Sequence, residues 1–178
     1  MTFARTRFLI AQDLRERAER SGKRYGWISY LKVLFDPPAL AVLIFRLQAF
    51  VHAKGFRRIA TFLRYVNIVC FSIDIGSGAQ IDAGFIIYHP NCVAICDECV
   101  AGKNLHLVHH NTVMLDPRDV TRDGRIVIED DIILGCGSRI IGPVKIGANS
   151  FIGASAVVTE DVPPFTFFLE PEFTHSEE

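Results

Sequence analysis

The segment GFIIYHPNCVAICDEC, residues 84–99, places one histidine just ahead of three closely spaced cysteines. His89 precedes a proline, and an imidazole with a pKa of about 6.5 can act as a metal ligand or as a proton acceptor at neutral pH. A histidine in an ordinary turn before a proline can also have neither role. Cys92, Cys96 and Cys99 have a C-x3-C-x2-C spacing, which is typical of iron–sulfur ligands elsewhere.

A second histidine cluster follows in the segment LHLVHHNTV. His106, His109 and His110 are of the residue type that, three at a time and with one water, forms a catalytic zinc site. The same side chains can also line a substrate groove or pack at a surface or subunit interface. We expect His109 and His110 to line the groove of an acceptor substrate, with packing as the alternative.

The elements that position these residues differ between the two halves of the chain. In the first half, apolar residues recur at helical spacing, and Ser21-Gly22, the prolines at 37–38 and Gly55 interrupt the pattern. The expected helices cover roughly residues 8–21, 27–34, 39–53 and 57–70.

Aliphatic residues in the second half recur every six positions. The later run consists of Ile128, Leu134, Ile140, Ile146, Ile152 and Val158, and the earlier run of Ile75, Ile81, Ile87, Val93, Cys99 and Leu105. Six residues turn an α-helix through about 600°, so such a repeat cannot stay on one helical face. The repeat fits a parallel β-helix, in which each six-residue unit forms one short wall and points its aliphatic residue into the core.

The two runs are out of phase, because Ile75 and Ile128 are 53 residues apart and 53 is not a multiple of six. We therefore expect a loop that leaves the coil near residues 113–126, where Asp, Arg, Pro and Gly are frequent. The expected organisation is a helical N-terminal region at 1–72, a β-helix at 73–163 and a C-terminal tail at 164–178. Such a stack leaves flat faces, so we expect a homotrimer with ligand grooves between subunits.

Charge is unevenly distributed along a chain whose formal net charge is −1. Residues 1–73 carry thirteen Lys and Arg against four Asp and Glu, and residues 74–178 carry six against sixteen. The near-zero total gives no indication of nucleic acid binding. Two interpretations of the basic helices stay open: a solvated polar face, or contact with an anionic membrane surface or a lipid-linked substrate. The arginines that would line this face are Arg46, Arg57, Arg58 and Arg64.

The N-terminal segment meets acidic residues before any long apolar run, so it does not resemble a signal peptide. The most apolar stretch, residues 39–45, is far shorter than the roughly 20 residues that a bilayer-spanning helix needs. Five cysteines, an odd number, favour reduced thiols over a disulfide framework. These features predict a cytoplasmic protein.

The pattern FSIDIGSGAQIDAGFIIYHPNCVAI, followed by ILGCGSRIIGPVKIGANSFIGASAVVTEDVPP, resembles the serine acetyltransferase family of left-handed β-helix acyltransferases. It is also similar to relatives in exopolysaccharide gene clusters, such as the colanic acid acetyltransferases. The resemblance extends from about residue 34 to about residue 164. It implies a mainly β chain, a left-handed parallel β-helix of hexapeptide repeats with an α-helical N-terminal region, that acts as an acetyl-CoA-dependent O-acetyltransferase.

In that family an Asp and a His fifteen residues apart form a catalytic dyad, and the resemblance carries these roles to Asp74 and His89. His89 would take the proton from an acceptor hydroxyl as it attacks the acetyl thioester, and Asp74 would orient the ring and stabilise its cation. Acetyl-CoA would lie along small residues of successive coils. The matching residues are Gly135, Cys136, Gly137, Gly153 and Ala154, each of which the tight corners of a β-helix explain equally well.

Several positions depart from the family's pattern for serine. Tyr88 replaces the Asp that precedes the catalytic His, Gly124 and Arg125 replace an Arg-His pair, and SGKRYG lacks the family's acidic residue. Tyr88 and Arg125 suit a neutral polyol, so we expect the acceptor hydroxyl on a sugar or polysaccharide precursor, with serine O-acetylation as the alternative. The tail, FTFFLEPEFTHSEE, also differs, and its aromatic residues are expected to cover the last coil.

Two other classes stay open. Trimeric left-handed β-helices include a zinc-dependent carbonic anhydrase class, but its acidic residues and spacing are not evident here, and no metal is expected. The other class is a catalytically silent scaffold. The iron–sulfur hypothesis is disfavoured, because the repeat points Val93 and Cys99 inward and leaves Cys92 and Cys96 at other positions of the coil.

Overall fold

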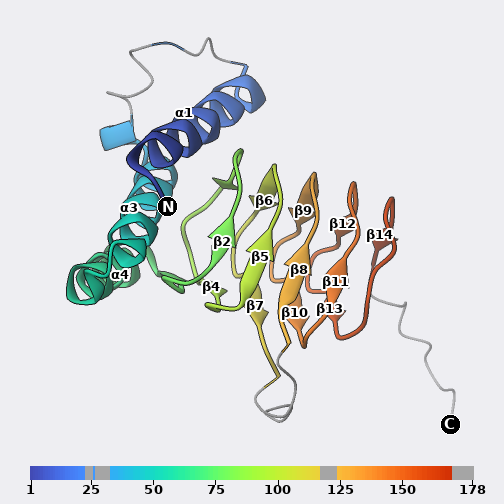
Figure 1. Cartoon of the computed structure of the whole chain (residues 1–178). Coiled ribbons are helices and arrows are strands. Elements are labelled where there is room, and N and C mark those ends of the chain that lie inside the picture. The colour runs from blue at the N-terminus through green and yellow to red at the C-terminus, as the bar shows by residue number, and fades with distance from the viewer. Residues whose placement is uncertain (23–25, 27–32, 117–123, 170–178) are drawn as a thin grey trace, which may run out of the picture.

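The structure is a computed structural model of the chain, and it describes residues 1–22, 26, 33–116 and 124–169. A layer of helices covers one end of a column of short strands, and the last strands of the chain lie at the other end (Figure 1). Among the residues described, none of the helices combines the length and the hydropathy that crossing a bilayer requires.

The helical layer consists of α1 (Phe3–Arg20), the 3-10 helix η1 (Val33–Phe35), α3 (Pro37–Ala53) and α4 (Arg57–Phe71). α3 and α4 match the helices expected over 39–53 and 57–70 to within two residues. α1 begins earlier than expected, because the Thr2 side chain caps it by accepting a hydrogen bond from the Arg5 backbone N–H at 3.2 Å. Most of the helix expected over 27–34 lies outside the described residues.

The strands form three parallel sheets, and consecutive strands of the chain belong to different sheets. Sheet A contains β1 (Ile73–Ile75), β4 (Val93–Ile95), β7 (Thr112–Met114), β10 (Arg139–Ile141) and β13 (Val157–Val158). Sheet B contains β2 (Gln80–Ile81), β5 (Cys99–Ala101), β8 (Ile126–Ile128) and β11 (Lys145–Ile146). Sheet C contains β3 (Ile86–Ile87), β6 (Leu105–Leu107), β9 (Ile132–Leu134), β12 (Phe151–Ile152) and β14 (Phe167–Phe168). Each coil therefore contributes one strand to each wall, and the predicted left-handed parallel β-helix is confirmed.

The core of this β-helix is formed by the six-residue repeat. Every residue of the two aliphatic runs is at most 5% exposed, as the pattern predicts. Phe45 of α3 belongs to the same hydrophobic cluster, so α3 closes the first end of the column. Phe168 packs against the cluster from β14, which pairs with β12, so the β-helix continues past the expected boundary at residue 163.

The repeat is interrupted at two places rather than one. Sheet A pairs Ile73 with Val93, Ala94 with Thr112, and Thr112 with Arg139, which gives successive separations of 20, 18 and 27 residues. Relative to an 18-residue coil, two residues are inserted after β3 and nine after β7. The second insertion falls where the loop near 113–126 is expected, but Val113 and Ile126 are buried strand residues, and residues 117–123 lie outside the described part of the chain.

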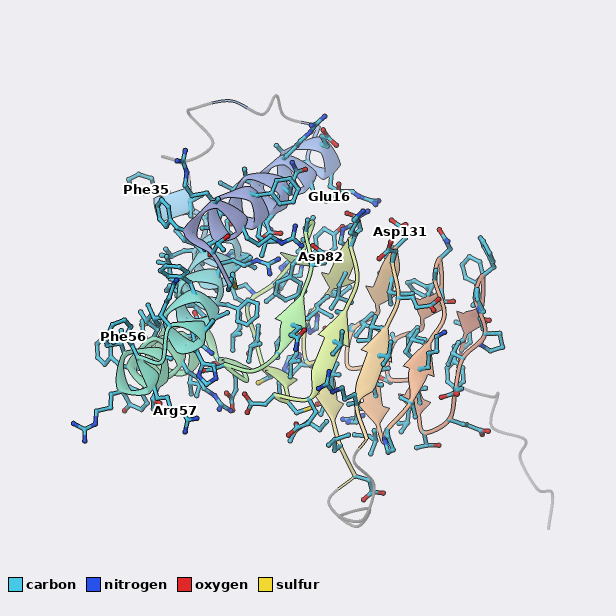
Figure 2. The ribbon with its side chains drawn as sticks, viewed as in Figure 1. Glu16, Phe35, Phe56, Arg57, Asp82 and Asp131 are labelled. Atoms are coloured by element: carbon cyan, nitrogen blue, oxygen red, sulfur yellow. The ribbon has the colours of Figure 1, made fainter. Side chains whose placement is uncertain are left out.

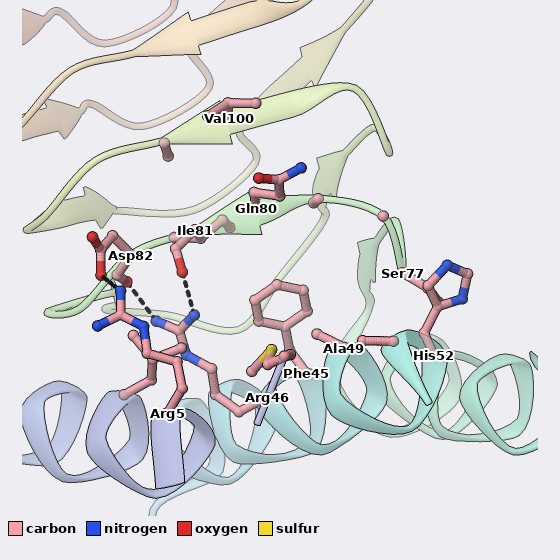
Figure 3. A pocket seen from close by; sticks show the side chains of 16 residues that line it. Arg5, Phe45, Arg46, Ala49, His52, Ser77, Gln80, Ile81, Asp82 and Val100 are labelled. Carbon is pink, nitrogen blue, oxygen red and sulfur yellow. Dashed lines mark hydrogen bonds and ion pairs between the residues drawn. The ribbon is translucent and has the colours of Figure 1, made fainter. Parts of the chain in front are cut away.

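A buried ion pair fastens the helical layer to the first coil. Arg46 of α3 donates from Nε to Asp13 Oδ2 of α1 at 2.8 Å and from Nη2 to Asp13 Oδ1 at 3.0 Å. The same guanidinium donates to the backbone carbonyls of Ile81, at 2.5 Å, and Asp82, at 2.6 Å (Figure 3). Arg46 is 2% exposed, so its expected place on a polar outer face is wrong. The burial of the Arg46 guanidinium costs little free energy, because these four hydrogen bonds replace those it would make with water.

The Asp13 carboxylate of this pair also accepts hydrogen bonds from the first coil. Asp13 Oδ1 accepts the backbone N–H groups of Gly84 and Phe85, each at 2.9 Å. Burial raises the pKa of Asp13, and the nearby Arg46 and these two N–H groups oppose that rise. Two helices and the corner after β2 thus share one network of hydrogen bonds.

Replacing Asp13 with Ala should lower the free energy of unfolding by about 3–5 kcal/mol, because Arg46 would be left buried without its counter-ion. Urea denaturation followed by circular dichroism measures this change. The control is Glu19→Ala, which removes a solvent-exposed pair with Arg15 and should cost less than about 1 kcal/mol. Equal losses in the two variants would contradict the role assigned to the Asp13–Arg46 pair.

Candidate active site

The two-residue insertion after β3 forms the corner that carries His89. The His89 backbone N–H donates to the Val108 carbonyl at 3.0 Å, and the Asn91 N–H donates to the His89 carbonyl at 2.9 Å. Cys92 adopts a φ of +49°, a left-handed conformation that completes the turn into β4. The His89 side chain is exposed at this corner, between sheets C and A.

The corresponding corners of later coils stack directly on this one. The Gly137 N–H donates to the His109 carbonyl at 2.9 Å, and the Ser155 N–H donates to the Cys136 carbonyl at 2.7 Å. The structure therefore brings most of the residues predicted for the acceptor and for acetyl-CoA to one edge of the β-helix. We call this edge the histidine edge, and it comprises His89, His109, His110, Gly135, Cys136, Gly137, Gly153 and Ala154.

His109 is the centre of the side-chain contacts on the histidine edge. Its ring lies 5.9 Å from that of His89, centroid to centroid, and its Nδ1 lies 2.6 Å from His110 Nδ1. One of these two nitrogens must donate and the other accept. Cys136 Sγ lies 3.2 Å from His109 Nε2 and 3.3 Å from Nδ1. The edge thus offers several imidazole nitrogens, which can accept or pass on a proton near neutral pH.

Asp74 is turned toward the helical layer. It lies in β1, and its Oδ1 accepts a hydrogen bond from Arg64 Nε of α4 at 2.5 Å. This hydrogen bond raises the pKa of the Arg64 guanidinium. Although Asp74 and His89 both belong to the described part of the chain, no hydrogen bond joins them. The Asp74–His89 dyad stays a prediction.

Tyr88 lies between the histidine edge and α1. Its ring is 6.0 Å from that of His106, and its backbone follows the Ile87 carbonyl, which accepts a hydrogen bond from Arg17 Nη1 at 3.1 Å. Asp36 holds Arg17 in place: Arg17 Nε donates to Asp36 Oδ2 and Arg17 Nη2 donates to Asp36 Oδ1, each at 2.7 Å. Sequence analysis missed Arg17 and Asp36, since no local pattern indicates contacts between residues 19 and 70 positions apart.

His106 does not join His109 and His110. It points outward from sheet C, is 1% exposed, and neither ring nitrogen has a hydrogen-bond partner among the described residues. Its Nε2 lies 3.5 Å from Glu16 Oε1 of α1. Burial, and secondarily the charge of Arg20, lower the pKa of His106.

The remaining polar clusters do not converge on a metal either. Among the residues that the structure describes, no three His, Cys, Asp or Glu side chains form a group that would hold a metal ion. Cys99 lies in the core, where burial raises its pKa to about 12, whereas Cys92 is exposed and Cys96 half-buried. These places match the scattered positions that the repeat predicts for the three cysteines.

Arg125 lies away from the histidine edge. It is exposed and directly precedes β8 of sheet B, whereas the histidine edge joins sheets C and A. Within one chain the structure does not bring Arg125 to His89.

Packing restricts two glycines of the histidine edge to different degrees. A Cβ on Gly135 would lie 2.8 Å from the backbone N of Ala154, whereas one on Gly153 would meet the end of the Leu169 side chain at 2.9 Å and the Phe168 carbonyl oxygen at 3.1 Å. Gly137 has a φ of +70°, which disfavours any larger residue. Their small size is therefore explained by the fold, and a role in binding acetyl-CoA stays a prediction.

A groove of about 650 Å³ lies on a different side of the molecule, between the helices and sheet B. Figure 3 shows Arg5 and Arg46 on its helical side and Gln80, Asp82 and Val100 on its sheet side. Arg5 forms an ion pair with Asp82 across it. None of the predicted site residues lines this groove.

Comparison with known proteins finds serine acetyltransferases among the relatives of this chain. Residues 125–160 match the family model described as bacterial transferase hexapeptide (six repeats). The serine acetyltransferase of Mycobacterium tuberculosis is 32% identical over 135 residues, which cover 75% of this chain and 58% of that protein. The serine acetyltransferase of Salmonella typhimurium is 27% identical over 71% of this chain and 46% of its own length. The chain thus spans about half the length of these curated relatives.

Solved structures agree with this result. The structure of soybean serine acetyltransferase complexed with serine has a TM-score of 0.79 and 30% identity, and the match covers 90% of this chain and 65% of that one. Brucella abortus serine acetyltransferase in complex with coenzyme A has a TM-score of 0.81. At 21% identity, with 91% of this chain and 64% of that one covered, the second match supports the fold alone.

The fold and the stacked corners define a left-handed β-helix, and residues 125–160 are similar to the hexapeptide repeats of bacterial transferases. Within that class, the sequence and the structure resemble the serine acetyltransferases.

His106 should make folding sensitive to acid. Because its pKa is lowered in the folded chain, the unfolded chain binds more protons below about pH 6.5, and the free energy of unfolding falls as the pH drops through that value. Replacing His106 with Phe should weaken this pH dependence, measured as urea midpoints at pH 7.5 and 5.5. His52→Phe, on α3, is the control and should retain the wild-type dependence. An unchanged dependence in His106→Phe would contradict the assignment.

Proposed function

We propose that this chain is an acetyl-CoA-dependent O-acetyltransferase of the serine acetyltransferase type. The observation that carries the proposal is the histidine edge, where an exposed imidazole at an inserted corner stands in line with small residues of the following coils. The resemblance to serine acetyltransferases supports the same activity.

The proposed chemistry needs one base. An alcohol is a poor nucleophile at neutral pH, so His89 accepts the hydroxyl proton as the oxygen attacks the thioester carbonyl. The carbon–oxygen bond forms, the carbon–sulfur bond breaks, and His89 returns the proton to the departing CoA sulfur. Backbone N–H groups are suitable donors to the oxyanion that develops on the carbonyl oxygen. In this proposal Asp74 orients His89, which requires it to exchange its contact with Arg64 for one with the imidazole.

The acyl donor is proposed to lie along the later corners of the histidine edge. Gly135, Gly137 and Gly153 present backbone without side chains there, and Cys136 and Ala154 add only small ones. A narrow pantetheine arm can approach backbone groups at such positions, whereas larger side chains would keep it away.

Serine and a neutral polyol are the two acceptors to be tested first. Serine is favoured by the relatives, which are serine acetyltransferases. A polyol is favoured by Tyr88, whose ring offers an apolar face and which stands where the family has an acidic residue.

A complete site is proposed to require two copies of the chain. Arg125 and the His89 corner lie at different edges of one β-helix, and a threefold arrangement would place an edge of one copy beside a different edge of the next. We therefore propose a homotrimer in which Arg125 of one subunit contributes to the acceptor site of its neighbour.

Replacing His89 with Ala should lower the rate of acetyl transfer about 10²- to 10⁴-fold, because the acceptor hydroxyl would lose its base. The rate is measured as release of the CoA thiol from acetyl-CoA in the presence of serine or a polyol panel. His52→Ala is the matched control, since His52 lies on α3 away from the histidine edge, and it should keep the wild-type rate. A wild-type rate in His89→Ala would rule out His89 as the base.

A further inference from the structure

The outer side of α4 exposes large apolar side chains. Phe56, Ile59, Phe62, Tyr65 and Val69 are 60%, 50%, 63%, 64% and 62% exposed. Ile59, Phe62 and Val69 are three and seven residues apart, a spacing that places them on one helical face. We call these five residues the α4 outer face. Figure 2 shows Phe56 on the side of the helical layer that points away from the β-helix, with Arg57 extending outward near it.

The inner side of α4 mixes apolar and polar residues, and its Phe71 is half-buried against the core cluster. Its buried residues are Ala60 and Asn67, and Asn67 Nδ2 donates to the Ala41 carbonyl of α3 at 3.0 Å. Arg64 also points inward, to Asp74. A helix on a solvated surface normally keeps large apolar residues off its outer side. The exposure of Phe62, Tyr65 and Val69 indicates that the α4 outer face is adapted to an environment other than water.

Exposed cations border this face, and carboxylates do not. Lys54, Arg57 and Arg58 are exposed at the N-terminal end of α4. Residues 37–73, which include α3 and α4, contain no Asp or Glu. The partner that fits this surface therefore combines negative charge with an apolar interior.

We propose that the α4 outer face binds the surface of an anionic phospholipid bilayer. The aromatic and aliphatic side chains enter the boundary between headgroups and acyl chains, and Lys54, Arg57 and Arg58 contact the lipid phosphates. The helix lies on the bilayer and does not span it, in keeping with its 15 residues.

A second copy of the chain fits this face less well. In a symmetric contact the same patch meets itself, so both copies would bring the same net positive charge to the interface. Because residues 37–73 lack acidic side chains, α3 and α4 supply no carboxylate to compensate that repulsion. A bilayer containing phosphatidylglycerol supplies the missing negative charge.

Co-sedimentation of the purified full chain with vesicles tests the proposal. We expect binding to vesicles of phosphatidylcholine with phosphatidylglycerol and little binding to phosphatidylcholine alone. The double variant Arg57→Glu, Arg58→Glu should lower the partition coefficient at least about 30-fold, since each basic residue contributes roughly fivefold at an anionic surface. Phe62→Ser should also weaken binding, because it removes an apolar contact.

Matched controls lie on the β-helix. Phe165→Ser changes an aromatic residue that is 77% exposed, and Lys103→Glu changes an exposed cation, and both should bind vesicles as the wild type does. Sedimentation velocity without lipid measures the oligomeric state, and so tests whether a second copy of the chain occupies the α4 outer face instead. If wild-type protein ignores anionic vesicles, or if Phe62→Ser dissociates an oligomer while leaving vesicle binding intact, the bilayer proposal is wrong. The thiol-release assay is independent of these outcomes, because none of the five substitutions lies on the histidine edge.

Discussion

The structure depends on the buried pair between Asp13 and Arg46. Through it α1 and α3 are joined to each other and to the backbone of the first coil at residues 81–85. Residues three and four positions beyond Asp13 lie on the same face of α1, so fixing Asp13 also fixes Glu16 and Arg17. Those two side chains contact His106 and the Ile87 carbonyl, one residue before Tyr88. The wall on the acceptor side of the histidine edge is therefore positioned by an ion pair that takes no part in the chemistry.

The second constraint is the stacking of coils. A β-helix of 18-residue coils places equivalent corners directly above one another, so a substrate bound along an edge meets one residue from each coil. The chain uses this order on the histidine edge and departs from it once there, where the first coil contains 20 residues. The two inserted residues belong to the corner that exposes His89. The insertion makes that corner different from the corners of the last two coils on this edge, where Gly135 packs closely against Ala154.

Much of the fold follows from the sequence, because the six-residue repeat is a direct consequence of coil geometry. The repeat predicts the inward residues, the three walls and the presence of an extruded loop. It does not reveal the two-residue insertion, because Val93 and Ile95 both point inward and the aliphatic pattern continues through it. The burial of Arg46 cannot be predicted from the sequence either. Its partner Asp13 lies 33 positions away, and an arginine in an amphipathic helix normally points to solvent. The histidine edge was predictable from the resemblance, whereas the contribution of α1 depends on long-range contacts that leave no local pattern.

We assign different roles to the two parts of the chain, the β-helix with its histidine edge and the helical layer with its α4 outer face. In the proposed account, the β-helix supplies a rigid edge on which the reacting groups are spaced by the coil repeat, and the helical layer supplies one side of the acceptor site and an outward-facing apolar surface. The central claim is that the rigid edge transfers an acetyl group. The most direct measurement is to incubate the purified protein with acetyl-CoA and either serine or a panel of polyols, and to quantify free CoA and O-acetylated product by mass spectrometry. The account predicts equal amounts of CoA and product with at least one acceptor. It is contradicted if no acceptor yields product and calorimetry detects no binding of acetyl-CoA.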